Sequence, residues 1–394
     1  MNNRATAVFI ASFFTVLAAY SIRYAYGTLL PEMLPALAIT KAQAGVIYAS
    51  YFIAYTIFSP IMGRVADRYD MRIIISVFMA IMGLGAFLMQ FAGSLWQASL
   101  FYGITGMGCA ACWAPVMALN QRWTSDKKRG MSLALVDAGS TIGVMTAGAV
   151  VPLLVSVSDW HLGWRVLGTF GLILAVVNFI LIRDRPAHEN QPNPSKKQAS
   201  ITYKELLTDR RFWFIGLAYL LVGVSIQIPF TFLSTYAVQE LKNPYETATR
   251  LITVIGVAGL VGKLTLGPLS DKIGRINIML ICALLTMIGC LGIAFSQSWI
   301  LFILSFIFGV GYGACWSMYA ACAADLFSKE SSGAIIGLWT VYLGIGLTIS
   351  PVIAGWTADK SGTLMWGFII AAAAGLGTMI LLLPLYKNKN FKIR

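Results

Sequence analysis

Three ionisable side chains interrupt otherwise apolar stretches of the sequence: Arg23, Asp137 and Lys263. A charge near the middle of a membrane costs at least about 2.5–3.5 kcal/mol on insertion scales, so each such residue is a candidate for function. An arginine or a lysine there could bind an anion, and an aspartate could accept a proton. Because His161 and His188 lie in polar segments, a proton-accepting role would fall on the carboxylate.

Arg23 lies roughly 25 Å along its apolar segment at 1.5 Å per residue, in the outer half of the membrane. Tyr20, Tyr26 and Gly27 share its helical face at spacings of three and four. We therefore predict that Arg23 faces a central cavity and binds an anion, with Tyr20 beside it. The alternative is that Arg23 extends to the outer interface or pairs with Glu32.

Aromatic residues recur in the middle of two other apolar stretches. Trp113 is followed by Asn120 seven residues later, and Trp316 is followed by Tyr319 three residues later. We predict that these four residues line an aromatic cage around a small organic substrate, with hydroxyl and amide groups supplying hydrogen bonds. The alternative is ordinary helix packing.

The elements that must position these residues follow from composition. The chain of 394 residues is 58% hydrophobic and 11% charged, whereas a soluble domain is about 25% charged. We therefore expect a polytopic, all-α membrane protein rather than a nucleic-acid-binding one, despite a net charge of +13. Apolar segments long enough to span lie near residues 6–30, 43–63, 73–93, 97–121, 131–156, 163–182, 212–237, 248–269, 276–296, 299–323, 333–357 and 363–385.

The distribution of charge predicts topology. If both termini are cytoplasmic, most of the 29 lysine and arginine residues lie in cytoplasmic segments, as the positive-inside bias requires. The only long polar stretch divides the chain almost in half. We therefore predict a six-helix bundle over residues 1–182, a cytoplasmic linker over 183–211 with a short amphipathic piece, and a second six-helix bundle over 212–394.

The two halves repeat each other at an offset of about 204 residues. GRVAD at 63–67 matches GPLSD at 267–271, Trp113 matches Trp316, and Gln227 occupies the position equivalent to Arg23. Six spans per half make the repeat parallel, an arrangement found in transporters whose substrate site lies between the halves. Gln227 is therefore a further candidate substrate-binding residue.

The repeated loops carry a more specific signal. The first contains Gly63, Asp67 and Arg68, and the second contains Gly267, Asp271 and Arg275. Both resemble the loop signature of the major facilitator superfamily. That resemblance implies a fold of twelve transmembrane helices, and it implies that these six residues form a cytoplasmic gate motif. The alternative is a pair of charged loops that only set topology.

A finer resemblance lies in the eighth span. Gly259, Gly262, Lys263, Gly267 and the Ser-Asp pair at 270–271 are similar to a pattern of monocarboxylate and oxalate/formate transporters, with lysine in place of their substrate-binding arginine. The resemblance implies that Lys263 binds a carboxylate, although a lysine lacks the bidentate fork of arginine.

In that superfamily the fifth and eighth spans face each other, so Asp137 and Lys263 could pair across the halves. We expect an incoming anion to replace Asp137 as the ion-pair partner of Lys263, so that Asp137 can then accept a proton. The alternative is a permanent structural ion pair.

These inferences combine into one expectation. We expect a secondary active transporter that moves a small organic anion, a monocarboxylate, together with protons by rocker-switch alternating access. An anion exchanger or a drug or metabolite exporter of the same superfamily is the alternative, and a membrane enzyme or a transporter-derived sensor is a more distant one. We predict no cofactor, no metal site, no nucleic-acid partner, and a monomer in the cell inner membrane.

Overall fold

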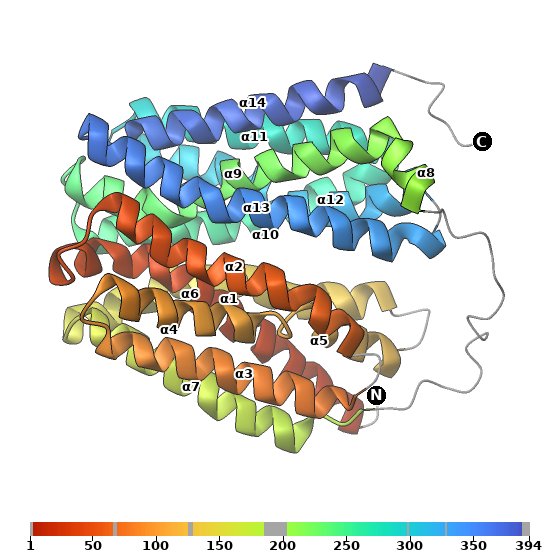
Figure 1. The fold of residues 1–394 in the computed structure, drawn as a ribbon, viewed down its shortest axis with the longest axis horizontal. Coiled ribbons are helices and arrows are strands. Elements are labelled where there is room, and N and C mark those ends of the chain that lie inside the picture. Colours follow the sequence, from red (N-terminus) through yellow and green to blue (C-terminus); the bar gives the residue numbers. More distant parts are fainter. Residues whose placement is uncertain are drawn as a thin grey trace. The chain divides into compact units, whose positions relative to one another are not determined.

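The computed structural model describes residues 3–65, 69–124, 129–184, 203–297, 299–327 and 329–387. These residues form helices and no strands. Twelve helical segments are long and apolar enough to cross a membrane (Figure 1). The predicted all-α, twelve-span architecture is therefore confirmed.

The helices extend a few residues beyond most of the predicted spans. Those of the first half are α1 (Asn3–Ala36), α2 (Lys41–Val65), α3 (Met71–Leu88) with a short 3-10 turn (Met89–Phe91), α4 (Leu95–Cys109), α5 (Ala114–Trp123), α6 (Arg129–Val157) and α7 (Trp160–Leu181). Those that follow are α8 (Tyr203–Thr208), α9 (Arg210–Gln239), α10 (Tyr245–Ile273), α11 (Arg275–Phe295), α12 (Ile300–Leu326), α13 (Lys329–Ser361) and α14 (Met365–Lys387).

Short polar residues mark several helix starts. The side chain of Asp70 accepts a hydrogen bond from the backbone N–H of Arg72 at the start of α3, and Asp159 caps α7. Slight burial acts to raise the pKa of Asp159, but hydrogen bonds from His161 and from the backbone outweigh it and hold that pKa below its usual value. Gly274 precedes α11 with φ +96°, a backbone conformation that favours glycine.

The fourth span is not the continuous helix predicted over 97–121. It breaks between α4 and α5, at Ala110–Trp113. The cause is Pro115, near the start of α5, which has no N–H to donate and whose ring would clash with the carbonyl four residues earlier. The break places Trp113 at a helix N-cap rather than within a regular helix.

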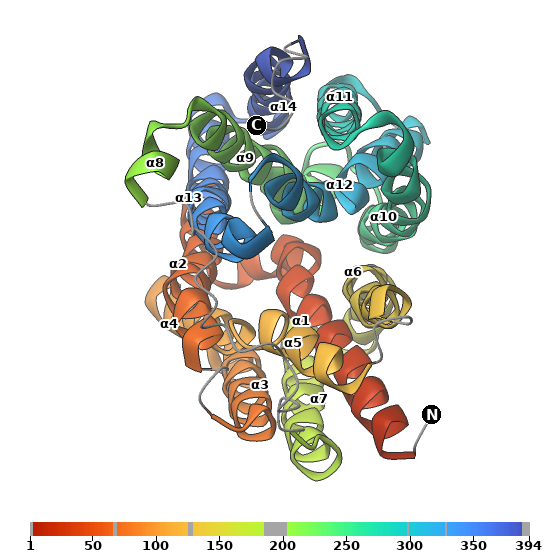
Figure 2. The same cartoon turned by 90° about the vertical axis from the view of Figure 1, so that its right-hand side faces the viewer.

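The chain divides into two compact units: Met1–His188 with Phe230–Gly256, and Glu189–Pro229 with Val257–Arg394. In the first unit α1 packs on α6 and α7, α3 packs on α4 and α7, and α2 packs on α4. In the second, α11 packs on α12 and α14, and α13 packs on α12 and α14. Figure 2 views these helices from their ends. The predicted boundaries at 182 and 212 follow the sequence repeat and stay a prediction.

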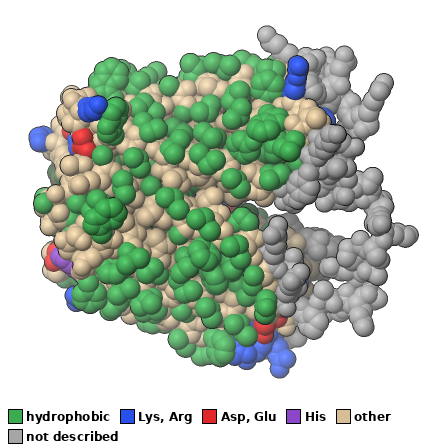
Figure 3. Space-filling model, viewed as in Figure 1, with side chains coloured by type: hydrophobic (Ala, Val, Ile, Leu, Met, Phe, Trp, Pro, Cys, Tyr) green, Lys and Arg blue, Asp and Glu red, His purple; other side chains and the backbone are tan. Residues whose placement is uncertain are grey.

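The surface agrees with a multi-pass membrane protein. Large hydrophobic side chains such as Ile57, Leu153 and Ile380 are more than half exposed along the helices. On the face shown in Figure 3, hydrophobic side chains cover the middle of the helices and charged ones gather near their ends. Lipid satisfies such a surface, whereas water does not.

Candidate functional site

Arg23 is buried on α1, with 5% of its surface exposed. Its guanidinium carbon lies 5.7 Å from the ring centre of Tyr20 and 5.3 Å from that of Tyr24. Within the part of the chain that the structure describes, Arg23 forms no ion pair, and its buried Nε has no hydrogen-bond partner. Arg23 is therefore neither an interfacial arginine nor a partner of Glu32.

Three more rings around Arg23 come from α2. The guanidinium carbon lies 5.9 Å from the ring centre of Tyr51, 4.7 Å from that of Phe52 and 5.8 Å from that of Tyr55. Sequence reasoning missed these residues and Tyr24. The signal was present, because positions 48, 51, 52 and 55 are all aromatic and share one helical face. We call Tyr20, Tyr24, Tyr51, Phe52 and Tyr55 the ring box.

The ring box stabilises a cation without neutralising it. Aromatic faces attract a guanidinium through their quadrupole, by up to about 2 kcal/mol when the pair is desolvated. Burial of an arginine away from water still costs several kcal/mol unless a counter-ion or hydrogen bonds compensate it. The site therefore favours an added anion with hydrogen-bond acceptors.

Asp137 lies on α6, half-buried, within the same unit. Its Oδ1 accepts a hydrogen bond of 2.9 Å from Nε1 of Trp113, at the break in the fourth span. Tyr20 lies within electrostatic range of both Arg23 and Asp137. The structure thus brings together the predicted residues Arg23, Tyr20, Trp113 and Asp137.

Other candidates of the first half lie differently from the prediction. Tyr26 points away from the ring box, since its hydroxyl donates to the carbonyl oxygen of Ala44 at 2.7 Å. Gly27 allows close backbone approach, because a Cβ there would overlap the carbonyl oxygen of Phe230. Asn120 is fully buried, and its Nδ2 donates to the carbonyl of Val116 within its own helix, at 2.7 Å.

An aromatic cluster also forms in the second unit. The rings of Tyr219 and Tyr319 stack with centres 4.0 Å apart, and Trp316 lies edge-on to Tyr219 and to Tyr312, at 6.2 and 6.1 Å. The hydroxyl of Tyr319 is buried and has no hydrogen-bond partner among the described residues. Trp316 and Tyr319 therefore do share a cluster, and sequence reasoning missed Tyr219.

Two polar candidates lie elsewhere in the second unit. Gln227 on α9 is fully buried, and Lys263 on α10 is half-buried. Asp137 belongs to the first unit and Lys263 to the second, so the predicted pairing between them stays a prediction.

The second copy of the gate motif ties three helices together. Arg275 pairs with Asp271 at 2.5 Å and with Asp325 at 3.3 Å, and it also donates to Ser270. These contacts link the end of α10, the start of α11 and the end of α12. Sequence reasoning missed Asp325.

In the first copy of the motif, Gly63 lies in α2, whereas Asp67 and Arg68 lie outside the described residues. Nearby, Arg122 at the end of α5 pairs with Asp184 at 2.9 Å, and Asp184 accepts the backbone N–H of Met71. This network links the third, fourth and sixth spans at the end of the bundle that we predict to be cytoplasmic.

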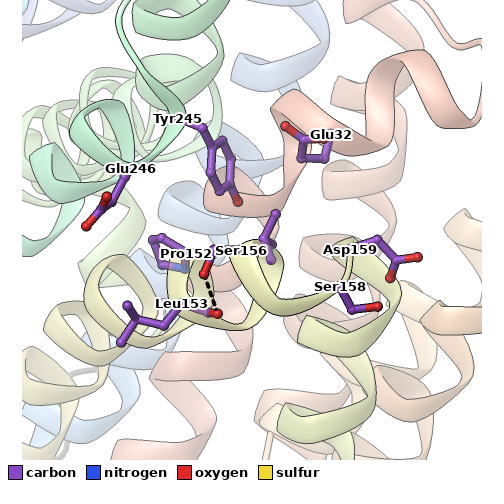
Figure 4. Close-up of a pocket in the computed structure, with 9 residues that line it drawn as sticks. Glu32, Pro152, Leu153, Ser156, Ser158, Asp159, Tyr245 and Glu246 are labelled. Atoms are coloured by element: carbon purple, nitrogen blue, oxygen red, sulfur yellow. Dashed lines mark hydrogen bonds between the residues drawn. The ribbon is translucent and has the colours of Figure 1, made fainter.

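A pocket of about 430 Å³ lies away from the ring box, at the far ends of α1, α6 and α10. Figure 4 shows Glu32, Tyr245 and Glu246 around it, together with Ser156 and Asp159 from the end of α6 and the following turn. Its lining includes the acidic residues Glu32, Asp159 and Glu246, which would repel an anion. It includes none of the predicted substrate-binding residues. Among the described residues, no group of three or more His, Cys, Asp or Glu side chains could hold a metal ion.

Known proteins resemble this chain over nearly its whole length. The membrane sensor protein UhpC of Escherichia coli K12 is 24% identical, over 92% of this chain and 88% of its own. A probable hexose phosphate transport protein of Chlamydia trachomatis is 25% identical, over 98% and 92%. Monocarboxylate transporter 12 of Xenopus laevis is 24% identical, over 82% and 76%.

The fold has the same likeness. The crystal structure of a D323A mutant of the nucleoside transporter NupG superposes with a TM-score of 0.82 at 15% identity, over 96% of this chain and all of that one. A model of the Major Facilitator Superfamily matches residues 9–262 and again residues 215–393. With twelve apolar helices and a family match over both halves, the chain belongs to the major facilitator superfamily of membrane transporters.

Proposed function

We propose that this transporter moves a small organic monoanion, a monocarboxylate, together with protons by rocker-switch alternating access. Arg23 binds the carboxylate, with Tyr20 and Lys263 as further polar contacts. The organic part contacts Trp113, Gln227, Trp316 and Tyr319. The protein lies in the cell inner membrane as a monomer with both termini in the cytoplasm.

The observation that carries this proposal is the buried guanidinium of Arg23, which forms no ion pair with any described residue and whose Nε has no hydrogen-bond partner among them. A carboxylate accepts two parallel N–H bonds from an arginine, which gives both energy and orientation. Because the buried Nε lacks a partner, an anion in the ring box would satisfy a donor that the protein leaves open. The remote alternative of a membrane enzyme has no comparable support from the described residues.

Charge favours a carboxylate over a phosphate ester. In the apolar middle of the spans, Arg23 and Lys263 are positive and Asp137 is negative, which leaves a single net positive charge. A carboxylate neutralises that charge, whereas a phosphate ester carries about −1.5 to −2 at pH 7. The repeat position equivalent to Arg23 is the neutral Gln227, so the second half offers no matching arginine.

A hexose phosphate is the second candidate, because one of the relatives above, from Chlamydia trachomatis, is named a probable hexose phosphate transport protein. One of these relatives is named a membrane sensor, so a protein that binds the anion without moving it is a further alternative. An exchanger or an exporter would use the same fold. These alternatives predict different ligands or different fluxes.

Thermal unfolding of the purified protein with pyruvate, lactate, oxalate and glucose 6-phosphate separates the candidate ligands. A ligand at 100 times its Kd stabilises the folded state by about 2.7 kcal/mol. We expect pyruvate or lactate to raise the Tm, and Arg23→Ala to abolish that rise. Arg165→Gln is the matched control, because Arg165 already donates to Gln90 at 2.7 Å and should leave the rise intact.

Uptake into proteoliposomes with an imposed pH gradient then tests transport. Accumulation of the stabilising monocarboxylate supports the proposal. A Tm rise with glucose 6-phosphate alone would establish the second candidate, and binding without flux under either gradient would establish a sensor. If none of the four anions bound or accumulated, the proposed function would be wrong.

A further inference from the structure

The backbone carbonyl oxygen of Arg23 accepts two hydrogen bonds from tyrosine hydroxyls. The hydroxyl of Tyr102 on α4 lies 2.7 Å from it, and that of Tyr48 on α2 lies 2.9 Å from it. Both tyrosines are fully buried. Two helices therefore hold one carbonyl of a third helix, at the residue whose side chain enters the ring box.

A buried hydroxyl without a hydrogen-bond partner is costly, and a phenylalanine would pack the same ring without that cost. The specific role of the two hydroxyls is therefore in the hydrogen bonds that they donate. The rings themselves are already fixed. Tyr102 lies 4.9 Å from Tyr26, 5.6 Å from Tyr48 and 4.9 Å from Tyr51, centre to centre, and edge-on to Trp164 at 5.7 Å. What the hydroxyls add is the rotation and height of α1 at Arg23.

That placement decides what the guanidinium can do. The guanidinium contacts rings on both α1 and α2, so α1 must keep a fixed orientation about its own axis relative to α2. A shift of one residue along the helix would move a side chain by about 100° around that axis. A bound anion needs a donor geometry held within a fraction of an ångström. The backbone contact lies only a few bonds from the Arg23 side chain.

We propose that Tyr48 and Tyr102 are positioning residues of the anion site. Through the Arg23 carbonyl they hold the guanidinium inside the ring box with its N–H groups available to an anion. The ligand in this proposal rests on the proposed function, whereas the placement of Arg23 does not. Neither tyrosine contacts the anion.

Tyr48→Phe and Tyr102→Phe test this proposal, and Tyr26→Phe is the matched control. Tyr26 belongs to the same buried ring cluster, but its hydroxyl donates to the carbonyl of Ala44 instead. Each change removes a buried hydrogen bond to a backbone carbonyl, so all three variants should lose thermal stability without ligand. The apparent Kd for pyruvate and for glucose 6-phosphate, from the dose dependence of the Tm, is the second readout.

We expect Tyr48→Phe and Tyr102→Phe to raise the Kd of the anion that binds by about three- to tenfold, the equivalent of one hydrogen bond, with no change in Tyr26→Phe. A purely structural role predicts a lower Tm in all three variants and unchanged affinity. Unchanged affinity in both Tyr48→Phe and Tyr102→Phe, or an equal loss of affinity in Tyr26→Phe, overturns the proposal.

Chemical modification of Arg23 gives a readout that needs no substrate. Phenylglyoxal labels arginines, and mass spectrometry of the peptide that contains Arg23 gives its labelling rate relative to that of the exposed Arg165. We expect the labelling rate at Arg23 to change by about threefold or more in Tyr48→Phe and in Tyr102→Phe. In Tyr26→Phe it should match the rate of the unchanged protein. If neither probe anion bound, the proposed function would fail while this measurement still decided the positioning role; equal labelling rates in all variants would overturn it.

Discussion

Arg23 and Tyr24 are adjacent residues on α1, and their side chains contact rings of other helices, α2 for Arg23 and α9 for Tyr24. The guanidinium of Arg23 lies among the rings of α1 and α2, while the ring of Tyr24 also lies 4.2 Å from that of Phe230, centre to centre. The rarity of a charge in a span was enough to single out Arg23. The ring box was not predicted, because it depends on which face of α2 meets α1, and many aromatic residues occur in these spans.

Asp137 gives a prediction at the residue scale. Asp137→Asn removes the ionisable carboxylate but keeps an oxygen that can accept the hydrogen bond from Trp113. We expect it to abolish net pyruvate uptake driven by a pH gradient and to spare exchange of pyruvate across the membrane, because exchange needs no net proton movement. Counterflow and gradient-driven uptake in the same proteoliposomes measure the two.

Trp113→Phe is the control for that change, because it removes the Nε1 donor and retains the carboxylate of Asp137. Gradient-driven uptake should persist in this variant at a reduced rate. Equal losses of exchange and net uptake in Asp137→Asn would mean that Asp137 is needed for binding or folding rather than for proton coupling.

At the scale of elements, the membrane-spanning helices could be predicted closely from the sequence. The break inside the fourth of them could not. Hydropathy gave twelve spans, since length and composition decide whether a segment crosses a membrane. A hydropathy window does not register a single proline, so the break before Pro115 was missed. The consequence is functional, because the break is where Trp113 meets Asp137.

Close packing of α4 on α2 gives a prediction at this scale. A Cβ at Gly106 would overlap the backbone carbonyl of Tyr51, whereas a Cβ at Gly103, one turn earlier on α4, would come no closer than 3.7 Å, to the carbonyl oxygen of Ser50. Gly106→Ala should therefore force α4 from α2 and cost about 1–3 kcal/mol, as overpacking does. Gly103→Ala should cost little or nothing.

The Tm of each purified variant measures that difference. The Gly106→Ala change should also weaken anion binding, because α2 carries Tyr51, Phe52 and Tyr55 of the ring box. Equal Tm values for the two glycine variants would show that the two helices do not approach as closely as the structure places them.

At the scale of the whole molecule, the repeated loop signature predicts the family, but the repeat overstates the likeness of the two halves. Trp113 and Trp316 are equivalent in sequence, yet α12 runs unbroken through Trp316 while the fourth span breaks at Trp113. The physical reason is local, because the position equivalent to Pro115 is Met318. Fold and family could therefore be predicted from pattern, whereas the side-chain environments, which single residues decide, could not.

Alternating access gives the last prediction. Lys41 at the start of α2 pairs with Glu240 just after α9, at 2.8 Å, and so joins a helix of the first repeat to a helix of the second. If the repeats part at these ends during each cycle, a covalent link between them must stop transport. The six native cysteines are all buried, whereas the side chains of Lys41 and Glu240 are partly exposed, so cysteines introduced at these two positions can be linked selectively.

We expect Lys41→Cys with Glu240→Cys, treated with a short bifunctional methanethiosulfonate, to lose nearly all pyruvate uptake and to recover it with dithiothreitol. Arg122→Cys with Asp184→Cys is the control, because that ion pair of 2.9 Å joins α5 to the segment that follows α7 within the same repeat, and these parts move together as the repeats rock. Linking it should leave uptake near that of the unlinked variant. Full uptake by the linked 41–240 variant would mean that these ends stay together through the cycle, and that access alternates by a motion other than rocking of the two repeats.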